Sequence, residues 1–240
     1  MAEAKACAAT DTEKARVRLF EQGQWDPMVK AKRLYDSKSK YAAEVAALQT
    51  APPPASRIPR LAVPASGDLA KVDWTQGETL RLSRDIFGYP APERQVEATI
   101  LHDGQYLYLR LQEKTDATKL QAAPDIFTGD DWELFWAAQR ERPYRQIGIN
   151  PRGAFQAIPY GEPKAWDHAL AVASEATPDA WTTRLCLPLA NVIPDGLKPG
   201  QTLYFNVVRA STAAQTPLAY SPHFILNFHV PARLAALKVE

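Results

Sequence analysis

Hydrophobic residues recur at helical spacing through the first part of the chain. Between about residues 11 and 49, apolar side chains return every three or four positions with lysines between them, which is the pattern of an amphipathic helix. Tyr41, Val45 and Leu48 continue this apolar stripe to its end. We therefore predict a helical extension over residues 1–50, whose stripe packs on a neighbouring domain or helix.

The extension has internal and terminal boundaries. Asp11 or Thr12 is suited to cap the first helix, and Gly23 and Pro27 are expected to break it and start a second one. The sequence APPPASRIPRLAVPAS follows at residues 51–66. Because repeated proline favours extended polyproline structure, we predict a stiff linker at this point.

After residue 66 apolar and polar residues alternate, as they do in strands. The clearest hairpin joins residues 96–101 to 106–111 through Asp103-Gly104, a pair suited to a tight turn. Short strands with little helix between them indicate a mainly β domain over residues 67–240, a jelly-roll-like antiparallel β-sandwich rather than a parallel sheet. The other predicted elements are strands at 131–137, 144–149, 154–158, 169–175, 181–187, 202–209 and 223–228, and one helical turn at 189–192.

Composition and charge exclude several classes of protein. Hydrophobic residues make up 46% of the 240 positions, which is enough for a globular core. The 28 basic and 27 acidic residues leave no basic footprint for a nucleic acid. No apolar run approaches the roughly 18 residues of a membrane-spanning helix, and the chain does not start like a signal peptide. Cys7 and Cys186 predict neither a disulfide nor a thiolate metal site.

The sequence FTGDDWELFW, residues 127–136, organises the candidate chemistry. Alternation in a strand places Trp132 and Trp136 on one face and Glu133 on the other, with Phe127 on the loop before it. A glycosidase would combine Glu133 with a second carboxylate, but two such groups must face each other across a sugar at roughly 5 to 9 Å. Neighbours in one strand do not supply that geometry by themselves.

Motifs for other chemistry are absent. The sequence contains no HExxH, GxSxG, Walker or GxGxxG motif. The four histidines show no metal-binding spacing, and we interpret them as surface or loop residues: His102, His168, His223 and His229.

Aromatic residues remain as the strongest signal for binding. Most of them are expected in the core, but Phe127 and Phe228 each lie at a strand margin beside turn or polar residues. A ring exposed there can pack on the C–H face of a sugar while a carboxylate or amide binds the hydroxyls.

From about residue 58 onward, the order of segments resembles the family 9 carbohydrate-binding modules and their DOMON-like sandwich relatives. The resemblance is carried by GDLAKVDW (67–74), DGQYLYLRLQEKTD (103–116), GDDWELFW (129–136), YRQIGINPRG (144–153), WTTRLCLPLANV (181–192), GQTLYFNVVR (200–209) and FHVPARLAALKV (228–239).

The resemblance implies a sugar site. In the family, two aromatic rings sandwich a terminal sugar, and a strand glutamate binds its hydroxyls. By position, Phe127 matches the first ring, Phe228 the second and Glu133 the carboxylate. Both rings are Phe here, whereas well-understood members carry Trp, which has more area and an N–H donor.

A second strand is also implied in the site. The Arg and Asn that the family places there fall on Gln146 and Gly148. Gln146 is therefore expected to contact hydroxyls, with Arg145 or Trp166 as a further contact, and Arg209 as another replacement for the missing charge.

The resemblance also implies a structural calcium ion in the loops, for which Glu113 and Asp116 are the matching acids. No other cofactor is expected. It further implies the end of a larger bacterial polysaccharide-processing protein, extracellular or periplasmic, whose catalytic domain is the partner of this region.

We therefore interpret the chain as a non-catalytic carbohydrate-binding module. Three alternatives remain: a glycosidase that uses Glu133 with Asp130 or Asp131, a structural domain that has lost sugar binding and docks a neighbour through its helices, and a haem-binding DOMON-type domain. For haem, Met28 lies outside the sandwich and no pair of axial histidines is evident.

Overall fold

The computed structural model describes residues 1–213 and 216–240, and the chain divides into two compact units, Met1–Thr50 and Ala51–Glu240. The first unit is helical. Its helices are α1 (Ala2–Cys7), α2 (Asp11–Phe20), α3 (Asp26–Ser39) and α4 (Ala42–Thr50). In the described residues no helix is long and apolar enough to cross a membrane.

The expected break between two helices is replaced by a wide turn. Thr10 caps α2, since its hydroxyl accepts from the Glu13 backbone N–H while Glu13 binds back to Thr10. A π-helical turn, Glu21–Trp25, then connects α2 to α3. Pro27 falls in the first turn of α3, where a backbone N–H has no helical partner to lose.

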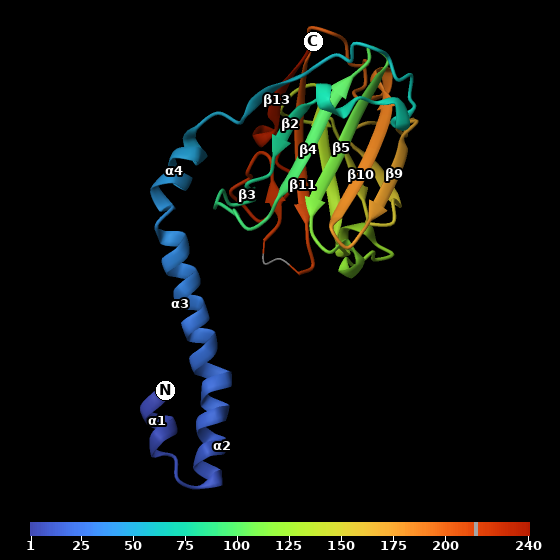
Figure 1. Cartoon of the computed structure of the whole chain (residues 1–240). Helices are drawn as coiled ribbons and strands as arrows, with labels where there is room; N and C mark the ends of the chain where they lie inside the picture. Colours follow the sequence, from blue (N-terminus) through green and yellow to red (C-terminus); the bar gives the residue numbers. More distant parts are fainter. Residues whose placement is uncertain (214–215) are drawn as a thin grey trace. The chain divides into compact units, whose positions relative to one another are not determined.

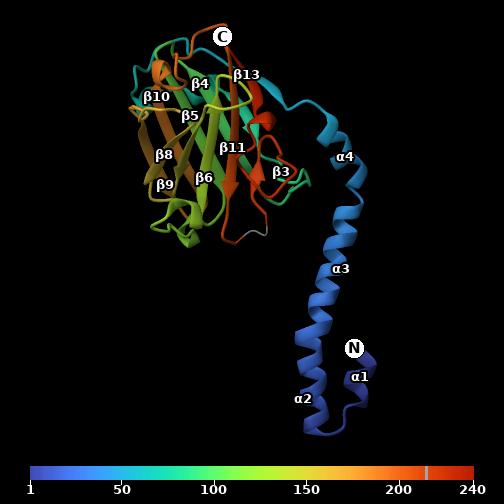
Figure 2. The same cartoon turned by 180° about the vertical axis from the view of Figure 1, so that it is seen from behind.

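The second unit is an antiparallel β-sandwich with one parallel pair at its edge, which confirms the predicted fold class. Figures 1 and 2 show its two layers from opposite sides. In the described part of the chain, the first sheet has the order β1 (Ala55–Ile58), β13 (Ala235–Val239), β11 (Thr202–Ala210), β6 (Asp131–Ala137), β7 (Tyr144–Ile149), β8 (Phe155–Tyr160), with β12 (Leu218–Ala219) beside β11 and β3 (Arg84–Asp85) beside β12. The second sheet has the order β2 (Glu78–Arg81), β4 (Val96–His102), β5 (Tyr106–Lys114), β10 (Ala180–Pro188), β9 (Ala171–Ala176).

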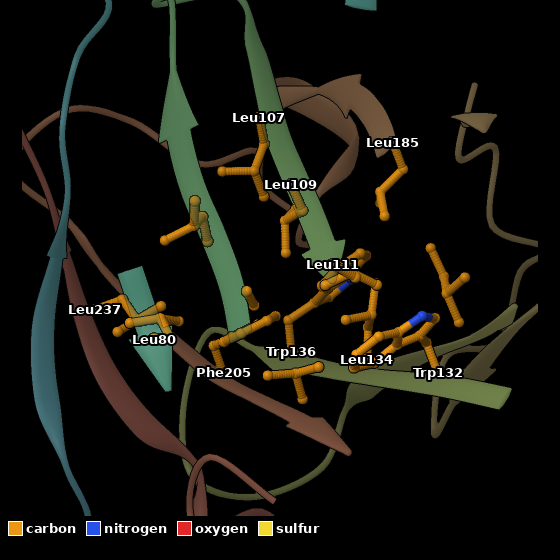
Figure 3. Close-up of a cluster of buried hydrophobic side chains, with 14 of the residues drawn as sticks. Leu80, Leu107, Leu109, Leu111, Trp132, Leu134, Trp136, Leu185, Phe205 and Leu237 are labelled. Carbon is orange, nitrogen blue, oxygen red and sulfur yellow. The ribbon is translucent and has the colours of Figure 1, made fainter. Parts of the chain in front are cut away.

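The inward faces of both sheets form the main core (Figure 3). Alternate residues of β6 turn inward, with Trp132 against Trp181 and Trp136 against Phe205. Leucines of β5 and β10 meet them from the second sheet. The alternation that predicted these strands therefore separates the two faces as expected.

Strand β6 is buried on both of its faces. Its outward residue Phe135 belongs to a second apolar cluster with Tyr144 and Val208, which Leu234 covers from the segment leading into β13. Glu133 lies in the same outward row as Phe135 and is also buried.

The predicted linker is part of the sandwich over much of its length. Residues 55–58 form β1, which pairs with β13 in parallel register. Ile58, Leu61 and Ala65 are buried, so apolar burial outweighs the extended preference of the surrounding prolines.

The last predicted strand, residues 223–228, is wrong. Phe224 adopts a left-handed backbone conformation with φ of 64°, which ends any extended pairing there. The predicted turn at 189–192 is found as a short 3₁₀ helix, Leu189–Asn191.

One buried charge network joins the two sheets. Arg209 of β11 is fully buried, with its guanidinium 4.7 Å from the ring centre of Trp181. Its Nε donates to Glu113 of β5 at 2.6 Å, and its Nη2 donates to Asp130 at 3.1 Å. Asp130 also accepts from the backbone N–H of Gln121, so the network fixes the loop that precedes β6.

Replacing Arg209 by Met is expected to lower the free energy of unfolding by about 3 to 5 kcal/mol, because buried Asp130 loses its cation and buried Glu113 keeps only Arg94. The control is Arg57→Gln, which removes exposed ion pairs with Glu78 and Glu240 and should change stability little. Urea unfolding of both variants measures the difference; equal, small losses would contradict a structural role for the buried network.

Candidate functional site

An open pocket of about 430 Å³ lies on the outward face of the first sheet. Its floor comes from β6, β7 and β8, and its walls come from a 3₁₀ turn, Ile126–Thr128, and from residues 226–229. The pocket brings together four of the residues that the sequence proposed for a sugar site, Phe127, Glu133, Gln146 and Phe228.

A chain of hydrogen bonds forms the polar floor. Gln146 donates from Nε2 to Oε2 of Glu133, and Tyr160 donates to Oε1 of Gln146 at 3.0 Å. Tyr160 is itself stacked on Tyr144 with 4.9 Å between ring centres. No described residue donates to Oε1 of Glu133, so this oxygen faces the pocket free for a ligand.

The position of the Phe127 ring depends on its 3₁₀ turn and on the absence of a side chain at Gly148. Asp125 accepts from the backbone N–H of Phe127 and caps the turn. Gly148 lies opposite Glu133 in the sheet, and a Cβ atom at Gly148 would come within 2.5 Å of Cε1 of Phe127. The half-buried ring therefore rests directly on the β7 backbone beside Glu133.

The facing wall combines an aromatic ring with a strongly exposed aliphatic side chain. Phe228 is partly buried against the outward apolar cluster, and its ring centre lies 5.9 Å from that of His223. Leu226 is 81% exposed at the pocket wall. Asn227 and His229 complete the wall with polar groups, so the pocket offers both apolar faces and hydrogen-bonding atoms.

Burial dominates the titration of the two outward acids of β6. It raises the pKa of Glu133 to about 7, against the opposing effect of the Gln146 hydrogen bond. Burial, and then the charge of Glu133, raise the pKa of Asp131 to about 9. Both oxygens of Asp131 are buried without a hydrogen-bond partner in the described structure, which favours the neutral acid.

Arg145 and Trp166 do not reach the pocket. Adjacent residues of a strand face opposite ways, so Arg145 points inward where Gln146 points outward. Arg145 binds Glu162 through Nε at 2.6 Å and through Nη2, and it packs on the ring of Trp166. Arg209, buried in the core network, does not line the pocket either.

Glu113 and Asp116 do not fit a shared calcium site. Both oxygens of Glu113 accept from arginines, Arg94 and Arg209. Asp116 caps a short turn and pairs with Lys119. Among the described residues no group of three or more His, Cys, Asp or Glu side chains is placed to hold a metal ion.

Four pocket residues were not expected from the sequence: Tyr160, Leu226, Asn227 and His229. Tyr160 carried a usable signal, since it is an aromatic residue at a strand margin like Phe127. Leu226 and Asn227 lie in the segment 223–228 that was expected as a strand, and His229 follows it directly. The real path of this segment is defined only by the tertiary structure.

No protein-family model and no curated protein matches this sequence. Solved structures do match its fold. A putative carbohydrate-binding protein from Bacteroides uniformis has a TM-score of 0.56 and 17% identity, over 79% of this chain and 99% of its own.

Two structures of a family 9 carbohydrate-binding module from Caldicellulosiruptor kristjanssonii, in complex with glucose and with cellotriose, each have a TM-score of 0.56 and 13% identity. They cover 77% of this chain and 94% and 93% of their own. The second unit therefore has the fold of family 9 modules, as the sequence resemblance implied.

The neutral state of Asp131 has a consequence for stability. Its folded pKa lies above its unfolded value of 3.8, so the folded state becomes costlier as pH rises from about 4 towards 9. Asp131→Asn removes this cost, and its unfolding free energy should exceed that of the wild type by an amount that grows from pH 4 to pH 8.

Asp130→Asn is the matched control, and the pKa shift of Asp130 has the opposite direction to that of Asp131. Despite burial, hydrogen bonds and Arg209 hold the pKa of Asp130 below its usual range, so its stabilisation is present above the unfolded pKa and lost as pH falls. This variant should lose stability at pH 8. Destabilisation of both variants at pH 8 would contradict the difference between the two neighbours.

Proposed function

We propose that the second unit is a non-catalytic carbohydrate-binding domain and that the pocket of Phe127, Glu133, Gln146 and Phe228 holds the sugar. The observation that carries this proposal is the convergence of two aromatic rings with a hydrogen-bonded carboxyl–amide pair in one open pocket. Its volume falls in the range of small-ligand sites, roughly 300 to 1,000 Å³.

The mechanism of binding follows from the groups present. The rings of Phe127 and Phe228 offer apolar surface to the C–H faces of a sugar. Oε1 of Glu133 is the open acceptor for a hydroxyl while the carboxyl is ionised, and the carboxyl becomes a donor when it is protonated. Tyr160 holds Gln146 by its carbonyl oxygen, which orients the Gln146 amide towards Glu133.

The ligand class and biological setting extend this proposal. The glucose and cellotriose in the family 9 structures make short glucose oligomers the first candidates. In the proposed setting, an extracellular or periplasmic bacterial protein, the domain tethers a glycan-active enzyme to its polymer and raises its local concentration there.

The geometry favours binding over hydrolysis. Asp130 is committed to Arg209, Gln121 and Thr212. Asp131 is completely buried, and neither aspartate lines the pocket. Glu133 is thus the one carboxyl among the described lining residues, whereas glycosidases use two across the sugar.

Replacing Phe127 or Phe228 by Ala should each weaken sugar binding by about 1 to 3 kcal/mol while leaving the fold intact, because stacking area is lost. Calorimetry with the best glycan from an array measures this loss. Phe155→Ala is the control, since this partly exposed ring lies outside the pocket.

Unchanged affinity in both pocket variants would refute the site. A silent array from folded protein would favour a domain that has lost sugar binding and serves a neighbouring domain instead.

Gly148→Ala tests the support of the first ring. The new methyl group would meet Phe127 and must displace it, so the affinity should fall about as far as in Phe127→Ala. The control is Ala157→Gly on the adjacent strand β8, where the side chain is directed to the core. Gly200→Ala is not a suitable control, because Gly200 has a positive φ. Wild-type affinity in Gly148→Ala, with a folded domain, would contradict this placement of Phe127.

A further inference from the structure

A second concavity lies on the other sheet, away from the proposed sugar pocket. Its volume is about 420 Å³, and it lies where β2 and β5 end and their common neighbour β4 begins. Arg81, Glu97 and Gln112 form one row across these strands, since Arg81 pairs with Glu97 and Glu97 with Gln112. The neighbouring residues Leu80 and Leu111 face the core, so this row faces outward.

Two cations in the lining of the concavity have no ion-pair partner among the described residues. Arg81 and Lys114 are exposed in its lining and form no ion pair with the described residues. Glu97 is the one carboxylate that lines it, within the described part of the chain. Two free cations against one carboxylate leave a local positive excess.

A third basic residue is fixed at the wall. Arg94 donates through Nε and Nη2 to Oε1 of Glu113, at 3.0 and 2.7 Å. Its Nη1 is buried and has no acceptor in the described structure. A buried donor without a partner costs free energy. An acceptor that reaches Nη1 would remove this cost, and Arg94 is already immobilised by Glu113.

We infer that this concavity is a second binding site, for an oxyanion such as the carboxylate of a uronic acid or the sulfate ester of a sugar. Carboxylate and sulfate oxygens match the donors of Arg81, Lys114 and Arg94, which form charge-assisted hydrogen bonds. That the anion is carried on a sugar rests on the proposed function, whereas the anion site itself does not. Because the two sites lie on different sheets, each can be occupied or lost independently.

The test is a titration of the full ¹⁵N-labelled chain followed by amide chemical shifts. The probes are glucuronate, glucose 6-sulfate and neutral glucose, at low salt. At least one of the two anions should shift the amide signals of residues 81–83, 94–97 and 112–114, and neutral glucose should not. Raising the salt to 0.3 M should weaken this binding because the cations are partly exposed.

Matched variants separate the site from general charge effects. Arg81→Ala combined with Lys114→Ala should weaken anion binding about tenfold, and Glu97→Gln should strengthen it by removing the opposing charge. Arg57→Gln removes one exposed cation elsewhere and should leave it unchanged.

The inference is overturned if neutral glucose shifts the same amides as strongly, if neither anion shifts them, or if Glu97→Gln weakens binding. Phe127→Ala should leave anion binding intact, so loss of the proposed sugar site and loss of this site give different results.

Discussion

The charge of Arg209 in the interior between the sheets is the interaction on which the arrangement of the site depends. Removing a guanidinium from water is costly, and a buried pair is tolerated only when its geometry satisfies the ions fully. Here Glu113 binds it from the second sheet and Asp130 from the start of β6. Asp130 also holds the backbone of Gln121 and the hydroxyl of Thr212, so one charge fixes both sheets and the loop between them.

That loop leads directly into the site. Phe127 lies three residues before Asp130 and is held at the other end by Asp125. The same strand then sends Trp132 and Trp136 into the core and Glu133 outward. The buried charge, the core and the pocket are therefore parts of one local structure.

Local pattern predicted much of this. Alternation placed most strands correctly because a buried row and an exposed row leave a period of two. Phe127, Glu133 and Gln146 meet because β6 and β7 are neighbours in the sheet, which a hairpin-like succession of strands favours. Phe228 was proposed for the site as a ring at a strand margin and from the family resemblance, although the strand predicted at 223–228 is absent.

Other features depend on contacts that no local pattern carries. Arg145 was expected beside Gln146 in the site, but consecutive residues of a strand point to opposite faces. The predicted strand at 144–149 therefore already argued against placing both side chains in one site. Nothing local indicates that Ile58 and Leu61 are buried between prolines, or that Phe224 turns left-handed. Glu113 likewise resembles a calcium ligand until its arginine partners, one of them 96 residues away, are known.

The most direct measurement is a crystal structure of the domain with the best-binding glycan from an array. We expect one sugar ring between Phe127 and Phe228, with a hydroxyl on Oε1 of Glu133. A neutral glycan bound at any other surface, with this pocket unchanged, would contradict the account.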